Sequence, residues 1–245
     1  MLQRILMCAG LATGTLLSGL HAMLTVPLIL RAEIYEARAS SGPASTSTHE
    51  HSDDAAAHHH DDHANADDDA EGWAPTGLQR VGLTLLATIL STVGFSLILV
   101  SAAVYGRGEL TILSGLGFGI AGFAATGLAT SLGLAPELPG SAAAGLVLRQ
   151  AWWFGTAVST AAGLAAIVFG PRLAFKILGL VLIVAPHAVG APGAEMAGSP
   201  VPAELSALFA ARSLALQGLM WVLLGLICGW IWERQARRLG DPVPT

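Results

Sequence analysis

Long apolar stretches separated by short polar turns dominate the chain. A helix rises about 1.5 Å per residue and the hydrocarbon core of a bilayer is about 30 Å thick, so about 20 apolar residues are typical of one membrane-spanning helix. Six stretches meet or approach this length. We therefore predict an all-α integral membrane protein of about six transmembrane helices. The predicted spans are residues 5–30, 81–104, 110–135, 151–170, 173–190 and 214–232.

Two of these stretches are irregular. The first is longer than the roughly 7–15 residues of a signal-peptide core, and no clear Ala-x-Ala site follows it, so a retained anchor helix is favoured over a cleaved signal. The fifth is short and contains Lys176 and Pro186. Proline removes a backbone donor and disfavours helix at the preceding residue, which predicts a break near Pro186. Broken spans are where transporters often place substrate sites.

The composition agrees with a membrane protein. Of 245 residues, 53% are hydrophobic and only 12% are charged, whereas soluble domains carry about 25% charged residues. This excludes a soluble enzyme and a disordered protein. The net charge of −5 would repel phosphate backbones, which excludes a nucleic-acid binder. No nucleophile–base arrangement can be placed, so a membrane enzyme is disfavoured and residues 1–245 are interpreted as a single membrane domain.

The distribution of positive charge predicts the orientation. With six spans, both termini lie on one side, which then holds seven of the 12 Lys and Arg residues, while the other side holds five. The first side includes an arginine cluster at residues 234, 237 and 238. Cytoplasmic loops carry the excess of Lys and Arg. We predict a multi-pass protein of a bacterial inner membrane, with cytoplasmic termini and a periplasmic first loop.

That first loop, residues 32–77, is the one extended hydrophilic part of the chain. Its segment 49–69 holds six of the eight histidines together with seven aspartates. Imidazole and carboxylate both ligate divalent first-row metals, and the acids raise the local cation concentration. We interpret the loop as a disordered metal-capture segment; the alternative is a solubilising loop without a ligand role. Mixed ligands of this kind do not select Co²⁺ over Ni²⁺ or Zn²⁺. The histidines are His49, His51, His58, His59, His60 and His63.

The two remaining histidines fall inside predicted spans. His21 lies about 24 Å along the first span and His187 about 21 Å along the fifth, by helical rise. Both spans run outward, so the two imidazoles reach similar depths. His21 also belongs to a small and polar stripe with Gly10, Gly14, Ser18 and Thr25, which either admits another helix or lines an aqueous cavity. We predict that His21 and His187 form an intramembrane metal site; the alternative for His21 is a hydrogen bond to a neighbouring helix.

Two outer carboxylates lie near this level of the chain. Glu137 stands in a proline-rich turn before Arg149, and Glu204 precedes the last span. Both are candidate metal ligands. For Glu137 an ion pair with Arg149 is at least as well supported.

At this point several motifs match a known family. The chain resembles the predicted cobalt transporter subunit family, CbtA, in its His-rich loop and in four motifs in order along nearly the whole chain. The resemblance implies membrane-embedded cobalt uptake linked to cobalamin metabolism, and a partner, CbtB, which is a small single-span protein. The motifs are Pro-Glu-Leu-Pro-Gly at 136–140, Arg-Gln-x-Trp-Trp at 149–153, Pro-His-x-x-Gly-Ala-Pro at 186–192 and Pro-x-Glu-Leu at 202–205.

We therefore expect a membrane subunit for uptake of Co²⁺ or a similar divalent metal, with no resident cofactor. Two other interpretations stay open. One is a sensing or accessory subunit without transport of its own, and the other is an exporter, if the orientation is reversed. A homo-oligomer is compatible with all three interpretations.

Overall fold

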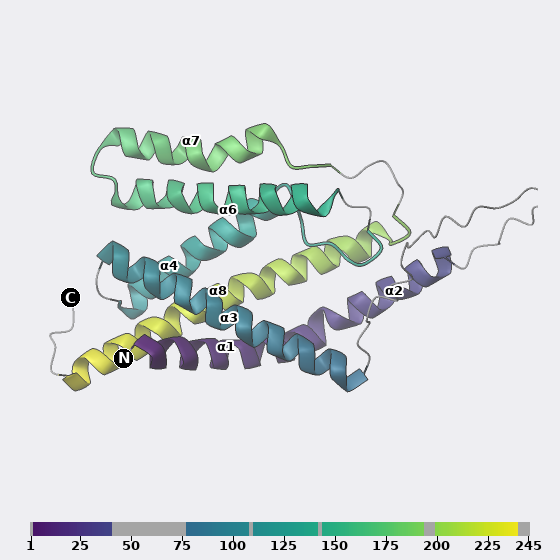
Figure 1. The fold of residues 1–245 in the computed structure, drawn as a ribbon, viewed down its shortest axis with the longest axis horizontal. Coiled ribbons are helices and arrows are strands. Elements are labelled where there is room, and N and C mark those ends of the chain that lie inside the picture. Colours follow the sequence, from purple (N-terminus) through teal and green to yellow (C-terminus); the bar gives the residue numbers. More distant parts are fainter. Residues whose placement is uncertain (1, 41–76, 108–109, 142–143, 194–198, 240–245) are drawn as a thin grey trace, which may run out of the picture.

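A computed structural model describes residues 2–40, 77–107, 110–141, 144–193 and 199–239 (Figure 1). Every regular element in these ranges is a helix, so the predicted all-α class is confirmed for them. The helices are α1 (Leu2–Leu24), α2 (Val26–Ser40), α3 (Gly77–Arg107), α4 (Ile112–Phe123), a π-helical turn η1 (Ala124–Leu128), α5 (Ala129–Ser131), α6 (Leu146–Phe169), α7 (Leu173–Val189) and α8 (Ala203–Leu239).

Within the described ranges, five helical segments are long and apolar enough to cross a membrane. They coincide with the first, second, third, fourth and sixth predicted spans. The helix at the fifth span, α7, has 17 residues, so its length of about 25 Å lies at the lower end of what a bilayer needs. The five segments are Met7–Leu24, Gln79–Gly106, Ile112–Ser131, Leu146–Phe169 and Ala203–Arg238.

The helix break lies in a different span from the predicted one. α7 continues through Pro186 and ends only at Gly190, whose φ of 86° terminates the helix. Proline lacks the N–H that would bond to Leu182 O, and the Ser159 hydroxyl of α6 donates to that carbonyl instead, at 2.6 Å. A neighbouring serine therefore satisfies the freed carbonyl, and the helix tolerates its proline.

The first span is the one that breaks. α1 ends at Leu24 and α2 begins at Val26, where the sequence predicted one helix over residues 5–30. Pro27 has no N–H to donate, and the next amide, of Leu28, bonds to Thr25 O at 3.0 Å rather than continuing the α-helical pattern. Leu24 O is thereby released and accepts a hydrogen bond from Arg212 Nη1 of α8 at 2.8 Å.

Glycines bring the central helices into close contact. A Cβ atom at Gly115 of α4 would lie 2.3 Å from Gly225 O of α8, and one at Gly225 would lie 2.3 Å from Gly115 O. α1 approaches α3 in the same manner, because a Cβ at Gly10 would lie 2.5 Å from Val93 Cγ2. Such contacts are the membrane form of tight helix packing. They hold α1, α3, α4 and α8 together as one bundle.

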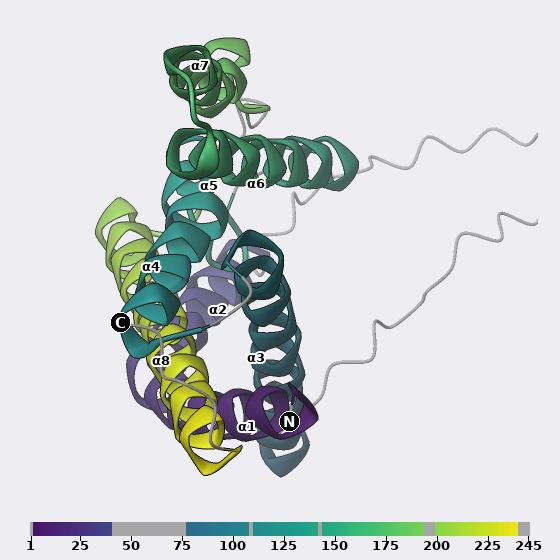
Figure 2. The same ribbon diagram turned by 90° about the vertical axis from the view of Figure 1, so that its left-hand side faces the viewer.

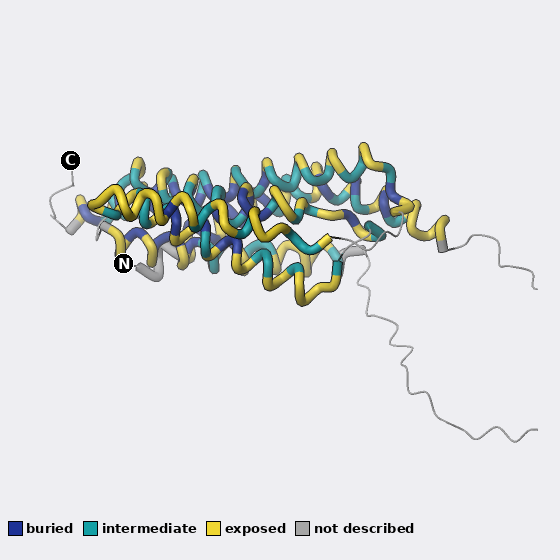
Figure 3. Tube along the Cα trace, turned by 90° about the horizontal axis from the view of Figure 1, so that it is seen from above, coloured by how far each residue is buried: buried dark blue, intermediate teal, exposed yellow. Residues whose placement is uncertain are grey.

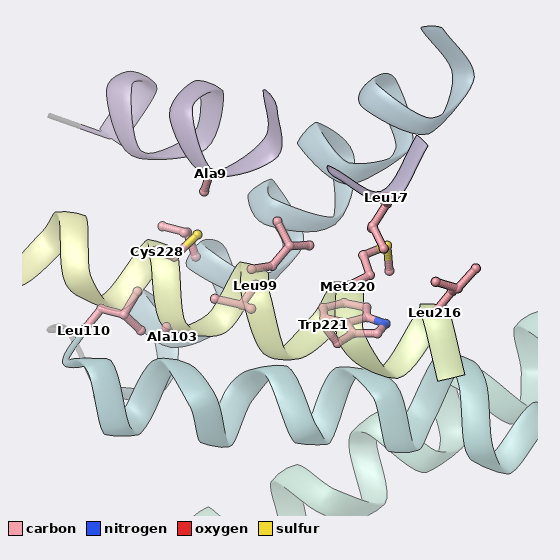
Figure 4. Packing of buried hydrophobic residues seen from close by; sticks show 11 residues of the cluster. Ala9, Leu17, Leu99, Ala103, Leu110, Leu216, Met220, Trp221 and Cys228 are labelled. Carbon is pink, nitrogen blue, oxygen red and sulfur yellow. The ribbon is translucent and has the colours of Figure 1, made fainter. Parts of the chain in front are cut away.

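Larger side chains fill the centre of this bundle. Figure 4 shows Leu17 of α1, Leu99 of α3 and Trp221 of α8 in one buried cluster. Figure 3 shows that the helices alternate between buried and exposed positions along their length. One stripe of each helix thus faces protein while the rest faces outward, as expected for a helix that is apolar all round and surrounded by lipid.

α6 and α7 form a hairpin that stands beside the bundle. Gly163 and Gly179 pack reciprocally, each with a Cβ position within 2.6 Å of the other's carbonyl oxygen. Figures 1 and 2 show that the end of α4, with η1 and α5, lies between this hairpin and the rest of the molecule. The hairpin is therefore attached to the bundle mainly through η1 and α5.

The helices alternate in direction, so segments that the sequence predicts on one side of the membrane lie at one end of the molecule. In Figure 1 the start of α1, the end of α8 and the α6–α7 turn lie at one end of the molecule. α2 and the start of α8 lie at the other end, where Leu28, Ala32, Leu138 and Val201 form a second apolar cluster. The ends of the molecule match the division of loops that the sequence predicts.

Candidate functional site

The start of α6 gathers residues from three of the sequence motifs. Arg149 Nη2 lies 2.5 Å from Glu137 Oε2, and the exposed fractions of the two side chains are 29% and 31%, respectively. The ion pair that the sequence offered as one interpretation of Glu137 is therefore present. Glu137 belongs to the Pro-Glu-Leu-Pro-Gly turn, so this bond holds the turn against α6.

One turn further along α6, Trp152 contacts His187 in the last turn of α7. The ring centroids are 6.0 Å apart and the planes meet at 70°, an edge-on arrangement. A Cβ at Gly133 would lie 2.4 Å from the Trp152 ring and 2.7 Å from Ala191 Cβ, so the segment after α5 closes over the same indole. His187 is half-buried, which agrees with an inward rather than a lipid-facing position.

α6 also carries a row of buried polar atoms without hydrogen-bond partners. They are Arg149 Nε, Trp152 Nε1, Thr156 Oγ1 and Thr160 Oγ1. Spacings of three and four residues place the four side chains on one face of the helix. Thr156 and Thr160 are only 1% and 3% exposed. A buried polar atom without a hydrogen-bond partner costs about 1–3 kcal/mol, so this row sets α6 apart from the helices that bury only apolar side chains.

His21 lies in the α1 bundle. It is half-buried and follows Leu17 on the stripe of α1 that packs against protein. Its Nδ1 lies 3.1 Å from Thr25 Oγ1, and the Thr25 hydroxyl also donates to His21 O at 3.0 Å. The imidazole therefore has a partner four residues along its own segment, in the turn between α1 and α2, rather than on a neighbouring helix as one interpretation held.

The part of this stripe nearest the N-terminus of α1 serves close helix packing. A Cβ at Gly14 would lie 2.5 Å from Thr92 Oγ1 of α3. Thr92 Oγ1 also donates to Gly10 O at 2.9 Å. Of the two roles that the sequence left open, approach of another helix is the one seen at Gly10 and Gly14.

The two membrane histidines occupy different helix pairs. His21 bonds to Thr25, His187 contacts Trp152, and within the described ranges no hydrogen bond or ring contact joins the two imidazoles. α1 and α7 nevertheless end toward the same end of the molecule (Figure 1). Among the residues that the structure describes, no three His, Cys, Asp or Glu side chains form a group suited to a metal. A shared site of His21 and His187 stays a prediction.

The remaining candidate ligands border two surface hollows or lie outside the described ranges. Glu204 is exposed in the first turn of α8 and borders a groove of about 430 Å³ with Arg31 and Arg38 of α2. Glu137 borders a second hollow of about 680 Å³. The six loop histidines, His49, His51, His58, His59, His60 and His63, lie outside the described residues.

One polar cluster was missed by the sequence reasoning. At the π-helical turn η1, Thr126 O accepts from Gln217 Nε2 at 3.2 Å, and Thr126 Oγ1 accepts from Trp221 Nε1 at 2.9 Å. A π turn leaves carbonyls without their α-helical donors, and such turns often occur at functional sites. The available signal was Gln217, an amide inside an apolar span.

Comparison with known protein families gives a match over nearly the whole chain. Residues 2–233 match the family described as "Probable cobalt transporter subunit (CbtA)". The chain belongs to the CbtA family. No curated protein and no solved structure matches it.

The family and the helices together define the class of this CbtA-family protein. It is a multi-pass membrane protein of a cobalt transporter family, and transport is not an enzyme activity. The word "subunit" in the family description implies a complex with a partner. The motif residues Glu137, Arg149, Trp152 and His187, on which the resemblance depends, meet at the first two turns of α6.

Proposed function

We propose that this CbtA-family protein is the membrane subunit of an uptake system for a divalent transition metal, Co²⁺ used in cobalamin metabolism. The observation that carries the proposal is the family match over residues 2–233, on a chain with five long apolar helices. The segment 49–69 collects metal by mixed imidazole and carboxylate ligation, for which Ni²⁺ and Zn²⁺ compete. The metal is the cargo, and no resident cofactor is required.

The proposed orientation places both termini in the cytoplasm of a bacterium and the His-rich loop in the periplasm. The charge asymmetry of the sequence supports it. The start of α1 and the end of α8 lie at one end of the molecule, as both termini on one side of the membrane require in either orientation. Reporter fusions at residue 245 and within the loop test this orientation: a cytoplasmic reporter should be active at the C-terminus and a periplasmic one in the loop.

The proposed path begins where the loop joins the helical bundle. Metal passes from the loop to His21 in the last turn of α1 and His187 in the last turn of α7, and imidazole nitrogens supply the ligands. Glu204 is exposed close to the base of the loop and serves as an entry carboxylate. Below His187, Thr156 and Thr160 offer hydroxyls without other partners along α6.

A small single-span partner of the CbtB type completes the complex in this proposal, and the complex can contain more than one copy of the chain. The family description supports a partner of some kind, because it names a subunit. Transport by the purified chain alone, compared with transport by the chain and its partner, distinguishes an autonomous carrier from a subunit that needs its partner.

Two other functions compete with uptake. A sensing or accessory subunit would bind metal through the same loop but move none itself. An exporter becomes favoured if the loop faces the cytoplasm, where it would collect metal for removal. The reporter fusions distinguish an exporter from an uptake subunit. Transport in liposomes distinguishes an accessory subunit from one that moves metal itself.

Uptake of radioactive cobalt by intact cells tests the intramembrane site. The double variant His21→Ala/His187→Ala should lose uptake at both low and saturating metal, because it lacks the two imidazoles. Ser18→Ala is the matched control, since the Ser18 hydroxyl bonds to Gly14 O of its own helix at 2.8 Å. Normal uptake by the double variant at wild-type expression would contradict the site.

A further inference from the structure

Two contacts of Thr25 bear on which nitrogen of His21 carries the proton. Thr25 Oγ1 lies 3.0 Å from His21 O, an oxygen that can only accept a hydrogen bond. The same Oγ1 lies 3.1 Å from His21 Nδ1. The hydroxyl has a single hydrogen, so when it donates that hydrogen to His21 O, Oγ1 meets Nδ1 with a lone pair and Nδ1 is the donor.

We propose that Thr25 is a positioning residue that holds neutral His21 with its proton on Nδ1, so that Nε2 keeps the lone pair that binds the transported divalent metal. A neutral imidazole carries one proton, so a donor at Nδ1 leaves an acceptor at Nε2. Metal-binding histidines ordinarily donate their other ring N–H to an oxygen in this way, which fixes the ring and its tautomer. The metal part of this inference rests on the proposed function; the tautomer does not.

The helix break holds Thr25 in place. Its side chain is buried, with 2% exposed. Its carbonyl accepts from both Leu28 N and Ile29 N, at 3.0 and 3.1 Å, which closes a tight turn immediately before α2. Arg212 of α8 fixes the preceding residue by donating to Leu24 O. The orientation of the imidazole therefore depends on a turn that α8 anchors, and not on one freely rotating hydroxyl.

Nitrogen-15 NMR of the full-length, metal-free protein labelled at histidine tests the tautomer directly. The spectrum is recorded at about pH 8, above the ordinary imidazole pKa of about 6.5. The His21 signals are assigned by their absence from the His21→Gln variant. We expect a protonated Nδ1 and an unprotonated Nε2. A neutral ring protonated at Nε2 would overturn the inference, because Thr25 would then donate to Nδ1, and so would a ring protonated at both nitrogens.

Variants at Thr25 test whether this tautomer matters to the metal. Thr25→Val keeps the β-branched shape but removes both hydrogen bonds, whereas Thr25→Ser keeps the hydroxyl. Loss of a residue that orients a metal ligand typically costs 10–100-fold in affinity or activity, so Thr25→Val should raise the cobalt concentration for half-maximal uptake by about that factor. Thr25→Ser should stay near wild type. Equal defects in both variants would overturn the positioning role.

The two levels of the proposal fail in different ways. If the NMR spectrum gives the expected tautomer but His21→Ala transports normally, the metal role of His21 is overturned while the geometry at Thr25 stands. If His21→Ala abolishes uptake but the ring is protonated at Nε2, the proposed function stands and the role of Thr25 is overturned. The wild-type spectrum decides the tautomer even if Thr25→Val does not fold.

Discussion

Arg149 and Glu137 form an ion pair across the loop between α5 and α6, with Nη2 and Oε2 2.5 Å apart. The pair ties one sequence motif to another, and the next turn of α6 places Trp152 against His187. A carboxylate that is held by an arginine has a structural role that does not depend on metal.

A charge swap distinguishes the two interpretations of Glu137. Glu137→Arg should impair cobalt uptake, because two arginines then face each other. Adding Arg149→Glu removes the repulsion and restores an ion pair with the charges exchanged. A partly exposed pair contributes only about 0–1 kcal/mol, so an imperfect fit of the exchanged pair costs little, and the double variant should recover most of the uptake. A metal-binding role for Glu137 predicts the opposite, namely that the double variant stays as poor as Glu137→Arg. Radioactive cobalt uptake at matched expression decides between them.

The tolerance of α7 for Pro186 gives a second prediction. Ser159→Ala should destabilise the protein by about 1–3 kcal/mol, because the part-buried Leu182 O then loses its donor. Pro186→Ala restores a backbone N–H that can bond to Leu182 O, so it should rescue Ser159→Ala. Thermal unfolding of the four proteins of this cycle in one detergent provides the measurement. Additive effects of the two substitutions would contradict the role assigned to Ser159.

Glycine packing between α4 and α8 gives a third prediction. Gly115→Ala should lower the free energy of unfolding by about 1–3 kcal/mol, the usual cost of overpacking, because its Cβ would lie 2.3 Å from Gly225 O. Gly117→Ala on the same helix is the matched control, since a Cβ there has no atom within 4 Å. Alanine exceeds glycine in helix propensity by about 1 kcal/mol, so the control should be no less stable than wild type. Equal stability of both variants would contradict the close contact.

Deletion of residues 49–69 tests the capture loop. A loop that only concentrates metal raises the local cation concentration without altering the path. The deletion should therefore reduce uptake at low external cobalt and leave the saturating rate near wild type. A shuffled segment of the same composition should restore uptake, because no fixed ligand geometry is required. Equal loss at every cobalt concentration would show that the loop does more than capture.

Helix positions were predictable from apolar length, but helix continuity was not. Pro27 and Pro186 both stand in apolar stretches, and the sequence favoured a break at Pro186. The outcome depends on tertiary donors: Ser159 satisfies the carbonyl released by Pro186, whereas Arg212 stabilises a released carbonyl near Pro27. Neither donor is adjacent in sequence to the proline it affects, so local propensity cannot identify it.

The candidate site, like the helices, was predictable only in part. The Glu137–Arg149 pair follows from two opposite charges on either side of a short turn. Helical rise also placed His21 and His187 toward the same end of the molecule. Axial depth, however, does not specify which helices are lateral neighbours, and the structure places His21 in the α1 bundle and His187 against α6. The polar turn at Thr126 depends on a π-helical turn that has no simple sequence pattern.

Metal uptake into liposomes that contain the purified chain is the decisive experiment for a transport function. The assay compares the chain alone with the chain plus its small single-span partner, for Co²⁺, Ni²⁺ and Zn²⁺ at equal concentrations. We predict inward movement of Co²⁺ that needs this chain and is abolished in His21→Ala/His187→Ala. Binding of metal to the vesicles without its appearance inside, with or without the partner, would contradict a transport role.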